Sequence, residues 1–450
     1  AEQLLEEMNQ YGLFPELVVE RENQAVEQSY FFPWMLLNYG DRTVRVSLLQ
    51  KNLGDSPEQR ILQSIQQLEY AILDGVYKIL LEEKKKIAVL SSHETSKDIL
   101  VTNFLQDLLP YYNLAAFDLE AFPETPEKTL ENLNRFDLLL VSNPKKVFSN
   151  TDKFILDQYT QQGGNSMYLI DPVHVQKDSL YALSGTTVSY GNSLELDDLF
   201  FKFGVRLRQE LVKDLYSAPI VLAQGQQNAS QYLPYPWPYN PLAAPNQDHP
   251  IGSAVGSVHF QFASPIDTLK NKVKKTVLIQ SSSLSKIEGI PSLINLSSAT
   301  EPIKPSLFTD SKQTLGVLLE GRFNSLYTNR IQPFEWKSKE IQPVRMAIFS
   351  DGNLLENQID KGQPLELGYD KWTNNFYSNK QFLKNTIHYL IEDNRFLSLR
   401  AKEIKIALLD TAKTESELIY WRYFGLFAPL LILLILGLIF NGYRLKSYRQ

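Results

Sequence analysis

Cysteine is absent from this chain of 450 residues. Its absence excludes disulfides, thiolate metal sites and cysteine nucleophiles, but it leaves the compartment open, because a chain outside the cytoplasm can also lack cysteine. The formal net charge is -6, so basic residues are not in excess. This charge argues against a nucleic acid as a partner.

Motifs for nucleotide binding and hydrolysis are also absent. The chain has no GxxxxGK[ST] phosphate loop, no GxGxxG after a predicted strand and no GxSxG elbow. The histidines show no ligand spacing, and His93-Glu94 begins like HExxH but Lys97 stands in place of the second histidine. We therefore predict no catalytic, cofactor-binding or metal-ligating residues, no cofactor, and a protein that is not an enzyme.

A long apolar stretch without a charged residue covers residues 423–443 and reads YFGLFAPLLILLILGLIFNGY. A helix rises about 1.5 Å per residue, so about twenty residues span the roughly 30 Å hydrocarbon core of a bilayer. A buried core helix is the alternative, but such a helix normally carries a polar stripe and this stretch has none. The pattern favours a transmembrane helix.

The charges on the two sides of this stretch predict its orientation. The tail at 444–450, RLKSYRQ, is basic and has no acid, whereas the predicted juxtamembrane helix at 411–422 carries charges of both signs. Under the positive-inside rule the tail lies in the cytoplasm. The bulk of the chain is then expected on the periplasmic side of the inner membrane.

Residues 1–82 read as a small α/β module. A predicted hairpin turns at Gly40-Asp41, and a helix starts at Ser56-Pro57, where a capping residue precedes a proline at the first helical position. The module lacks a complete first element, so we expect that its start is truncated.

Residues 83–410 alternate between predicted strands and helices. Strands such as 136–141 and 167–170 are nearly continuous in apolar residues, as in strands covered on both faces, and helices with short loops separate them. The pattern predicts an α/β fold: a flavodoxin- or Rossmann-like, doubly wound, mostly parallel sheet, with the small N-terminal module before it and the C-terminal transmembrane helix after it.

The segment 224–250 is rich in Gln, Asn, Pro and aromatic residues and is predicted to be a long loop. Its centre, QYLPYPWPYNPLA, holds Tyr232, Tyr235, Trp237 and Tyr239 among four prolines. A stiff aromatic segment loses little entropy on binding, so these residues are candidates for partner contact. The alternative is that the aromatic side chains fold back onto the core.

Asp351 is the acid best placed for a site. It follows the predicted strand 344–349, and α/β sheets place their sites at the carboxyl ends of strands. The alternative is that Asp351-Gly352-Asn353 makes a turn, and no partner base or nucleophile is visible. Asp171-Pro172 and Asp197-Asp198 have the same two interpretations, turn or helix cap first and site second.

Several long segments resemble the GldG-type auxiliary subunits of gliding-motility ABC transporters. The matching segments lie in order at 169–214, 234–251 (PYPWPYNPLAAPNQDHPI), 262–282, 318–330 (LLEGRFNSLYTNR) and 346–410. The resemblance covers essentially the whole chain. It implies a large extracytoplasmic region, a separate ABC ATPase subunit and a separate permease subunit as partners, and a link to gliding motility; it brings no catalytic residues.

Three functions follow from these patterns. The first is a non-enzymatic, membrane-anchored auxiliary subunit of an ABC transporter, which the apolar helix, the missing phosphate loop and the resemblance favour. The second is an extracytoplasmic solute- or glycan-binding module. The third is a hydrolase or amidotransferase on a flavodoxin-like sheet, against which the lack of cysteine and of a triad pattern counts.

Overall fold

The computed structural model describes residues 6, 8, 11–22, 25–49, 57–182, 185–224, 231–337, 340–391 and 418–447. Packing divides the chain into two units, residues 1–402 and 403–450. The predicted domain boundary near residue 82 therefore falls within the first unit. The two units are described separately below.

The described residues between 11 and 80 form two hairpins and two helices. Strands β1 (Glu16–Glu22) and β2 (Ala25–Phe31) pair antiparallel, as do β3 (Trp34–Tyr39) and β4 (Arg42–Ser47). Helices α2 (Pro57–Gln66) and α3 (Leu68–Leu80) follow. Gly75 lets α3 approach the second hairpin closely, because a Cβ at this position would lie 2.3 Å from Val46 Cγ2.

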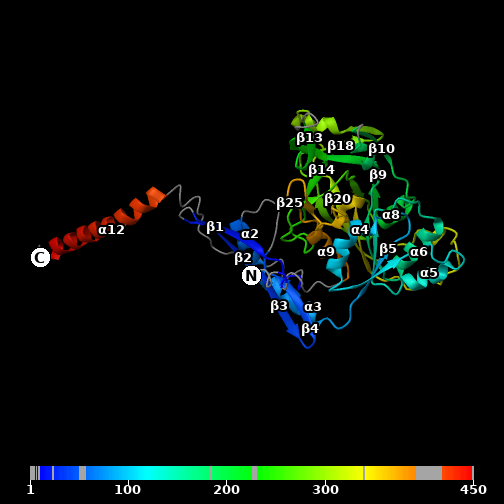
Figure 1. Cartoon of the computed structure of the whole chain (residues 1–450), viewed down its shortest axis with the longest axis horizontal. Helices are drawn as coiled ribbons and strands as arrows, with labels where there is room; N and C mark the ends of the chain where they lie inside the picture. Colours follow the sequence, from blue (N-terminus) through cyan, green and yellow to red (C-terminus); the bar gives the residue numbers. More distant parts are fainter. Residues whose placement is uncertain are drawn as a thin grey trace. The chain divides into compact units, whose positions relative to one another are not determined.

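A mixed ten-stranded sheet organises the main part of the first unit (Figure 1). One half is parallel, in the order β6–β5–β7–β8–β21, and the other half continues antiparallel through β20, β17, β14 and β13, with β15 paired to β14. Its strands are β5 (Lys86–Leu90), β6 (Asn113–Phe117), β7 (Leu138–Ser142), β8 (Asn165–Leu169), β13 (Ser217–Gln224), β14 (Gln231–Pro245), β15 (Val258–His259), β17 (Lys274–Gln280), β20 (Thr314–Gly321) and β21 (Val344–Phe349). The α/β class is confirmed, but the prediction of a mostly parallel sheet is wrong, because half of the strands pair antiparallel.

Both faces of the parallel half are covered by helices. Along β7, Leu139 and Val141 join one core with α5 and α6, while Leu138 and Leu140 join the other core with α4 and α9. This alternation follows from the two-residue period of a strand. The helices are α4 (Asp98–Leu108), α5 (Pro126–Leu133), α6 (Asn150–Gln161), α8 (Asp197–Phe203) and α9 (Asn379–Leu390), while the short helix α7 (Lys177–Leu180) packs in the third core described next.

Short strands form a third core beside the sheet, around Trp237, Tyr239 and Phe262. Strands β9 (Val173–His174), β12 (Glu210–Asp214) and β19 (Ser292–Asn295) contribute to this core. The other short strands of the first unit are β10 (Thr186–Gly191), β11 (Val205–Leu207), β16 (Ile266–Thr268), β18 (Ser285–Gly289), β22 (Ile359–Asp360), β23 (Gln363–Pro364), β24 (Tyr369–Asp370) and β25 (Asn375–Phe376). Single 3-10 turns are η1 (Leu296–Thr300), η2 (Pro305–Leu307), η3 (Leu326–Asn329) and η4 (Gly352–Leu355).

The prediction of a loop at 224–250 is wrong over most of that segment, because β14 spans Gln231–Pro245 and pairs with β13. Pro234 and Pro236 are two residues apart in β14, so the backbone positions that lack an N–H group lie on the same side of the strand. Over this stretch β13 is the neighbour of β14. An edge strand tolerates prolines whose missing donors face away from its neighbour.

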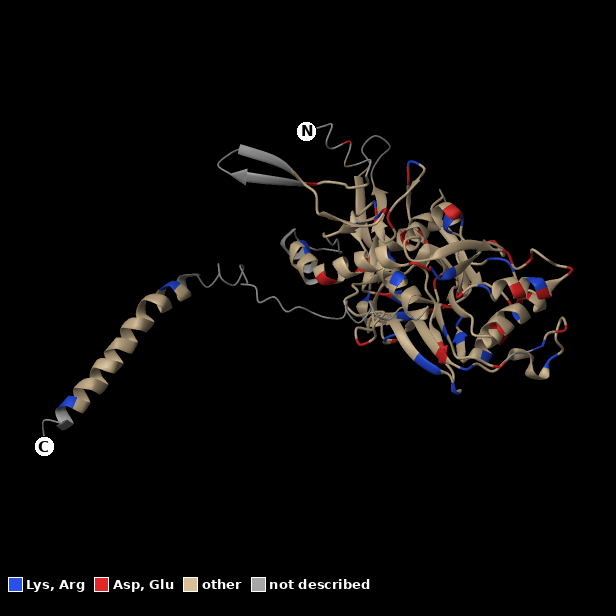
Figure 2. Ribbon diagram, turned by 90° about the horizontal axis from the view of Figure 1, so that it is seen from below, with Lys and Arg blue, Asp and Glu red and all other residues tan. Residues whose placement is uncertain are grey.

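The described part of the second unit is one helix, α12 (Leu418–Ser447). Its segment Tyr420–Arg444 is long and apolar enough to cross a membrane by length and composition. Figure 2 shows it almost free of charged residues between basic residues near its ends. This helix includes the predicted span 423–443; residues 411–417 of the predicted juxtamembrane helix and 448–450 of the predicted tail lie outside the described residues.

Candidate functional site

Two acids meet at the carboxyl edge of the parallel strands. Asp171 follows β8 and Asp351 follows β21, and these strands are neighbours in the sheet. Asp351 Oδ1 accepts a hydrogen bond from Asn353 N (2.8 Å), and Oδ2 accepts one from Gln261 N (2.6 Å). Asp171 Oδ1 accepts one from Gly352 N (2.6 Å). Asp351 therefore has the helix-cap geometry at η4 and also lies beside a second carboxyl group.

Burial and the nearby carboxylate of Asp171 raise the pKa of Asp351 to about 7. Asp351 is only 1% exposed. Burial also raises the pKa of Asp171, with the backbone N–H of Gly352 acting in the opposite direction. Burial and a neighbouring carboxylate both disfavour the ionised form, so Asp351 tends to hold a proton near neutral pH.

The remaining space at this edge is small. A cavity of about 40 Å³ is lined by Asp351, His259, Glu356 and neighbouring residues. It has room for only a few water molecules. Burial lowers the pKa of His259 to about 4, so this imidazole is neutral at pH 7.

The chain fills the position between β5 and β7 with its own groups. At this point the strand order reverses, because β6 and β7 pair with opposite sides of β5, and open α/β sheets commonly bind ligands there. Glu356 Oε1 accepts hydrogen bonds from Ser96 Oγ (2.7 Å) and Asn143 Nδ2 (3.1 Å). Sequence reasoning missed Glu356 and Asn143, although Asn143 directly follows β7, and a polar residue at a strand end is the signal that could have identified it.

His93 is a loop histidine after β5 and takes part in capping α6. Its Nδ1 lies 3.0 Å from Ser92 Oγ, and its Nε2 lies 3.4 Å from Asp152 Oδ2. Asp152 also completes the capping box of α6 with Ser149. Among the described residues, no group of three His, Cys, Asp or Glu side chains is placed to hold a metal ion.

Asp197 and Asp198 lie in the first turn of α8. Asp198 pairs with Lys153 (3.2 Å) and Arg330 (2.5 Å), so its carboxylate ties α8 to α6 and to the residue after η3. Burial raises the pKa of Asp198, but Arg330 and Lys153 outweigh burial and lower it below the usual value. The structure therefore places both acids at a helix start and Asp198 in an ion-pair network.

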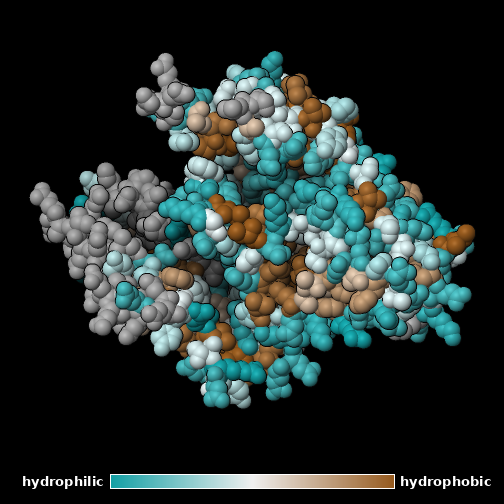
Figure 3. Space-filling view, turned by 45° about the vertical axis from the view of Figure 1, so that its right-hand side comes forward, coloured by the Kyte–Doolittle hydropathy of each residue, from teal (hydrophilic) through white to brown (hydrophobic). Residues whose placement is uncertain are grey.

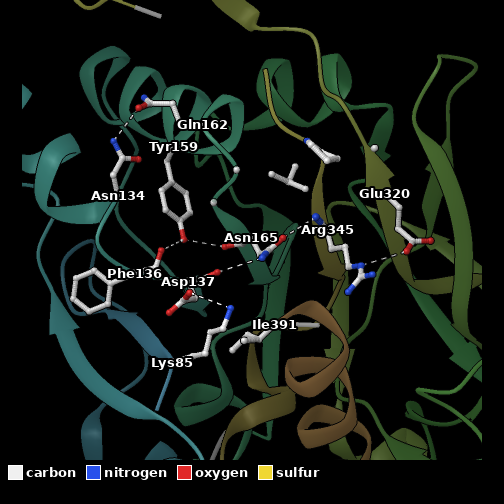
Figure 4. A pocket seen from close by; sticks show the side chains of 15 residues that line it. Lys85, Asn134, Phe136, Asp137, Tyr159, Gln162, Asn165, Glu320, Arg345 and Ile391 are labelled. Carbon is white, nitrogen blue, oxygen red and sulfur yellow. Dashed lines mark hydrogen bonds and ion pairs between the residues drawn. The ribbon is translucent and has the colours of Figure 1, made fainter. Parts of the chain in front are cut away.

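A larger cavity of about 530 Å³ lies at the opposite, amino edge of the parallel strands (Figure 4). The residues immediately before β5 and β7, the first residue of β8 and the start of β21 contribute to it. It is lined by polar side chains and a few apolar ones: Lys85, Asn134, Phe136, Asp137, Tyr159, Gln162, Asn165, Glu320, Arg345 and Ile391, with Gly163, Gly164, Gly321, Pro343 and Val344. We call it the amino-edge cavity. A search for sites at the carboxyl ends of strands overlooks it.

Hydrogen bonds fix the polar groups of the amino-edge cavity. Asn165 Oδ1 accepts from Arg345 N (2.8 Å), and Asn165 Nδ2 donates to Asp137 O (3.3 Å), so one amide connects three strands at this edge. Tyr159 Oη donates to Phe136 O or Asn165 O, each 3.2 Å away. Figure 4 shows these groups around the opening. The arrangement is a preformed polar pocket of the size that small-molecule sites have.

The comparisons with known proteins point to a transport system. A family model described as an ABC-type uncharacterized transport system matches residues 84–386. The chain belongs to this family. The match covers the α/β sheet, including β14, and ends within α9. No curated protein matches the chain.

Solved structures show distant likenesses. A chain titled "mmIFT52 N-terminal domain" has a TM-score of 0.38 and 11% identity, covering 68% of this chain and 97% of that one. A putative ThuA-like protein from Parabacteroides merdae ATCC 43184 has a TM-score of 0.31 and 7% identity, covering 73% and 94%. Both likenesses are too distant to bear on the fold.

The four aromatic residues proposed for partner contact divide into two pairs in this family member. Trp237 and Tyr239 are 1% and 4% exposed and belong to the third core, so they pack inside as the alternative interpretation expects. Tyr239 Oη donates to Glu288 Oε2 (2.5 Å), and burial together with this carboxylate raises the pKa of Tyr239. Tyr232 is 66% exposed and stacks on Trp372, and Tyr235 is half-buried.

The surface offers further exposed apolar residues. Figure 3 shows several hydrophobic groups within a mostly hydrophilic face of the molecule. On the sheet of β10 and β19, Val188 and its cross-strand partner Leu293 are both exposed. Isolated apolar residues on a surface are ordinary in soluble domains, so these groups do not define a site by themselves.

Proposed function

We propose that the chain is a non-enzymatic, membrane-anchored auxiliary subunit of an ABC transporter associated with gliding motility. Its membership of the transport-system family over residues 84–386 carries this proposal. The apolar segment Tyr420–Arg444 supports an anchor in the inner membrane. The GldG-type resemblance of the sequence adds the link to gliding motility.

The partners in this proposal are a separate ABC ATPase subunit and a separate permease subunit. The chain has no phosphate loop, so the energy of ATP hydrolysis has to come from another polypeptide. The crowded carboxyl edge supports a non-enzymatic role, because Glu356 occupies the usual ligand position and the space beside Asp351 is about 40 Å³. The basic tail supports a periplasmic location for the first unit.

A measurement of ATP hydrolysis tests whether the ATPase activity belongs to a separate subunit. The purified full chain in lipid nanodiscs is expected to release no phosphate from ATP above a mock preparation. Addition of the ATPase and permease subunits purified from the same organism should supply the activity, and the auxiliary chain should change its rate. ATPase activity that follows the isolated chain through purification would overturn the proposal.

A further inference from the structure

We propose that the amino-edge cavity is a binding site for a neutral saccharide. This inference goes beyond the transporter subunit role and does not depend on it, because it rests on the walls of one cavity. Its volume of about 530 Å³ lies in the range of small-molecule sites. Its lining is mostly polar, which does not suit a lipid or an apolar peptide.

The charges on the cavity walls balance. On one wall Lys85 Nζ lies 3.5 Å from Asp137 Oδ1, and on the other Arg345 Nε lies 3.6 Å from Glu320 Oε1. Each cation thus has an anion beside it on its own wall, as Figure 4 shows. A free anion or cation would meet no excess of opposite charge, so the walls favour an uncharged ligand.

The same walls offer many hydrogen-bonding groups of both kinds. The rim amides, as we call those of the lining residues Asn134 and Gln162, lie 3.3 Å apart from Nδ2 to Oε1, and the two carboxylates and the guanidinium add acceptors and donors. An amide presents two donors and an acceptor, while a sugar hydroxyl donates once and accepts twice. A ligand rich in hydroxyls can therefore pair with donors and acceptors in turn along these walls.

The lining is held in place before any ligand arrives. Asp137 Oδ2 accepts from Lys86 N (2.8 Å), and Arg345 Nη1 donates to Tyr389 O (2.9 Å). In the cavity wall Gly164 lies against the ring of Tyr159, and a Cβ on Gly164 would lie 2.3 Å from that ring. A site whose groups are fixed by other hydrogen bonds loses less entropy on binding.

Isothermal titration calorimetry tests the proposal on the full chain. The chain should be placed in lipid nanodiscs, because maltoside and glucoside detergents carry sugars themselves. The neutral probes are maltotriose, cellotriose, xylotriose and N,N′,N″-triacetylchitotriose, each at up to millimolar concentration. The charged probes are the zwitterion glycylglycine and the anion inorganic phosphate. We expect at least one neutral trisaccharide to bind and neither charged probe to compete with it.

Variants assign the binding to this cavity. The double variant Asn134→Ala/Gln162→Ala removes both rim amides and should weaken binding about tenfold or more. Gln313→Ala is the matched control, since Gln313 is also a half-buried glutamine that donates to main-chain oxygens, and it lies outside the cavity. Asn134→Trp blocks the opening with bulk and should abolish binding while the melting temperature stays near that of the wild type.

Three results would overturn the proposal: none of the four trisaccharides binds, the double variant binds as tightly as the wild type, or glycylglycine or phosphate occupies the cavity instead. Recovery of the ATPase and permease subunits with the double variant separates the two proposals. If a chain binds no sugar but still co-purifies with both subunits, only the saccharide proposal fails and the auxiliary-subunit proposal stands.

Discussion

Asp351 is the side chain whose ionisation the fold changes in a way that can be measured. Its pKa moves from an ordinary value of 3.8 to about 7, because it is buried beside Asp171. In the folded chain the group keeps its proton up to about pH 7, whereas in the unfolded chain it loses the proton near pH 4. The folded state binds more protons between these values, so this group lowers stability as pH rises from about 4 to about 7 and adds no further change above that.

The substitution Asp351→Asn is expected to flatten the pH dependence of stability. Between pH 5 and 7 the wild type should lose up to about 1.4 kcal/mol more per pH unit than the variant, since one proton is involved. The measurement is denaturant unfolding of the full chain at pH 5, 6, 7 and 8. Asp178→Asn, at an exposed aspartate, is the control. If the unfolding free energies of Asp351→Asn and the wild type change equally with pH, the pKa of Asp351 is not raised by burial beside Asp171.

Trp237 and Tyr232 lie on the same strand and should respond differently to truncation. Trp237 is 1% exposed in the third core, so Trp237→Ala should cost about 3–5 kcal/mol of unfolding free energy. Tyr232 is 66% exposed, and Tyr232→Ala should stay within about 0.5 kcal/mol of the wild type. Denaturant unfolding measures both. If both variants keep wild-type stability and Trp237→Ala alone loses partner subunits, Trp237 faces a partner instead of the core.

Helix α3 shows how one buried acid joins the N-terminal elements to the main sheet. Tyr111 Oη donates to Asp74 Oδ1 (2.6 Å), and Lys78 Nζ lies 2.7 Å from Asp74 Oδ2. Burial alone would raise the pKa of Asp74, but Lys384 and Lys78 outweigh burial and lower it to about 2. The stabilisation from this depressed pKa is present above about pH 4 and is lost as the pH falls towards 2.

Asp74→Ala is therefore expected to loosen α3 from its neighbours. Removing one partner from a buried ion pair costs about 3–5 kcal/mol. Hydrogen exchange followed by mass spectrometry should show faster exchange over residues 68–80 in the variant, with little change in β7 and β8. Glu131→Ala, at an exposed acid of α5, should leave all of these regions as in the wild type. Unchanged protection of 68–80 in Asp74→Ala would contradict the anchoring role of Asp74.

At the level of elements, local sequence predicted the strands of the parallel half and their arrangement as a parallel sheet, whereas the antiparallel pairing of the other half was not predicted. Strands such as β7 are short apolar runs between helices, a pattern that local sequence specifies. In β14 the prolines read as a loop signal, although the segment forms a hairpin with β13, the strand directly before it in the chain. Asp351 was found because it follows a strand. The amino-edge cavity was not, because its residues come together only through the strand order.

For the whole molecule, the tail charges predict that the first unit lies outside the cytoplasm. Protease added to intact spheroplasts should digest residues 1–402 and leave a C-terminal tag protected. After lysis the tag should become accessible, which is the internal control. Protection of the first unit in intact spheroplasts would reverse the topology, because a polypeptide cannot be cleaved across a sealed membrane.

Affinity purification from native membranes tests the auxiliary-subunit role most directly. The full chain carries a C-terminal tag, is extracted in mild detergent, and its co-purifying proteins are quantified by mass spectrometry. A tagged, unrelated protein with one C-terminal membrane helix is the matched control. We expect an ABC ATPase and a multi-span permease at near-stoichiometric amounts with the chain and at background amounts with the control. Recovery of the chain without either subunit, under conditions that preserve other transporter complexes, would contradict its assignment as a transporter subunit.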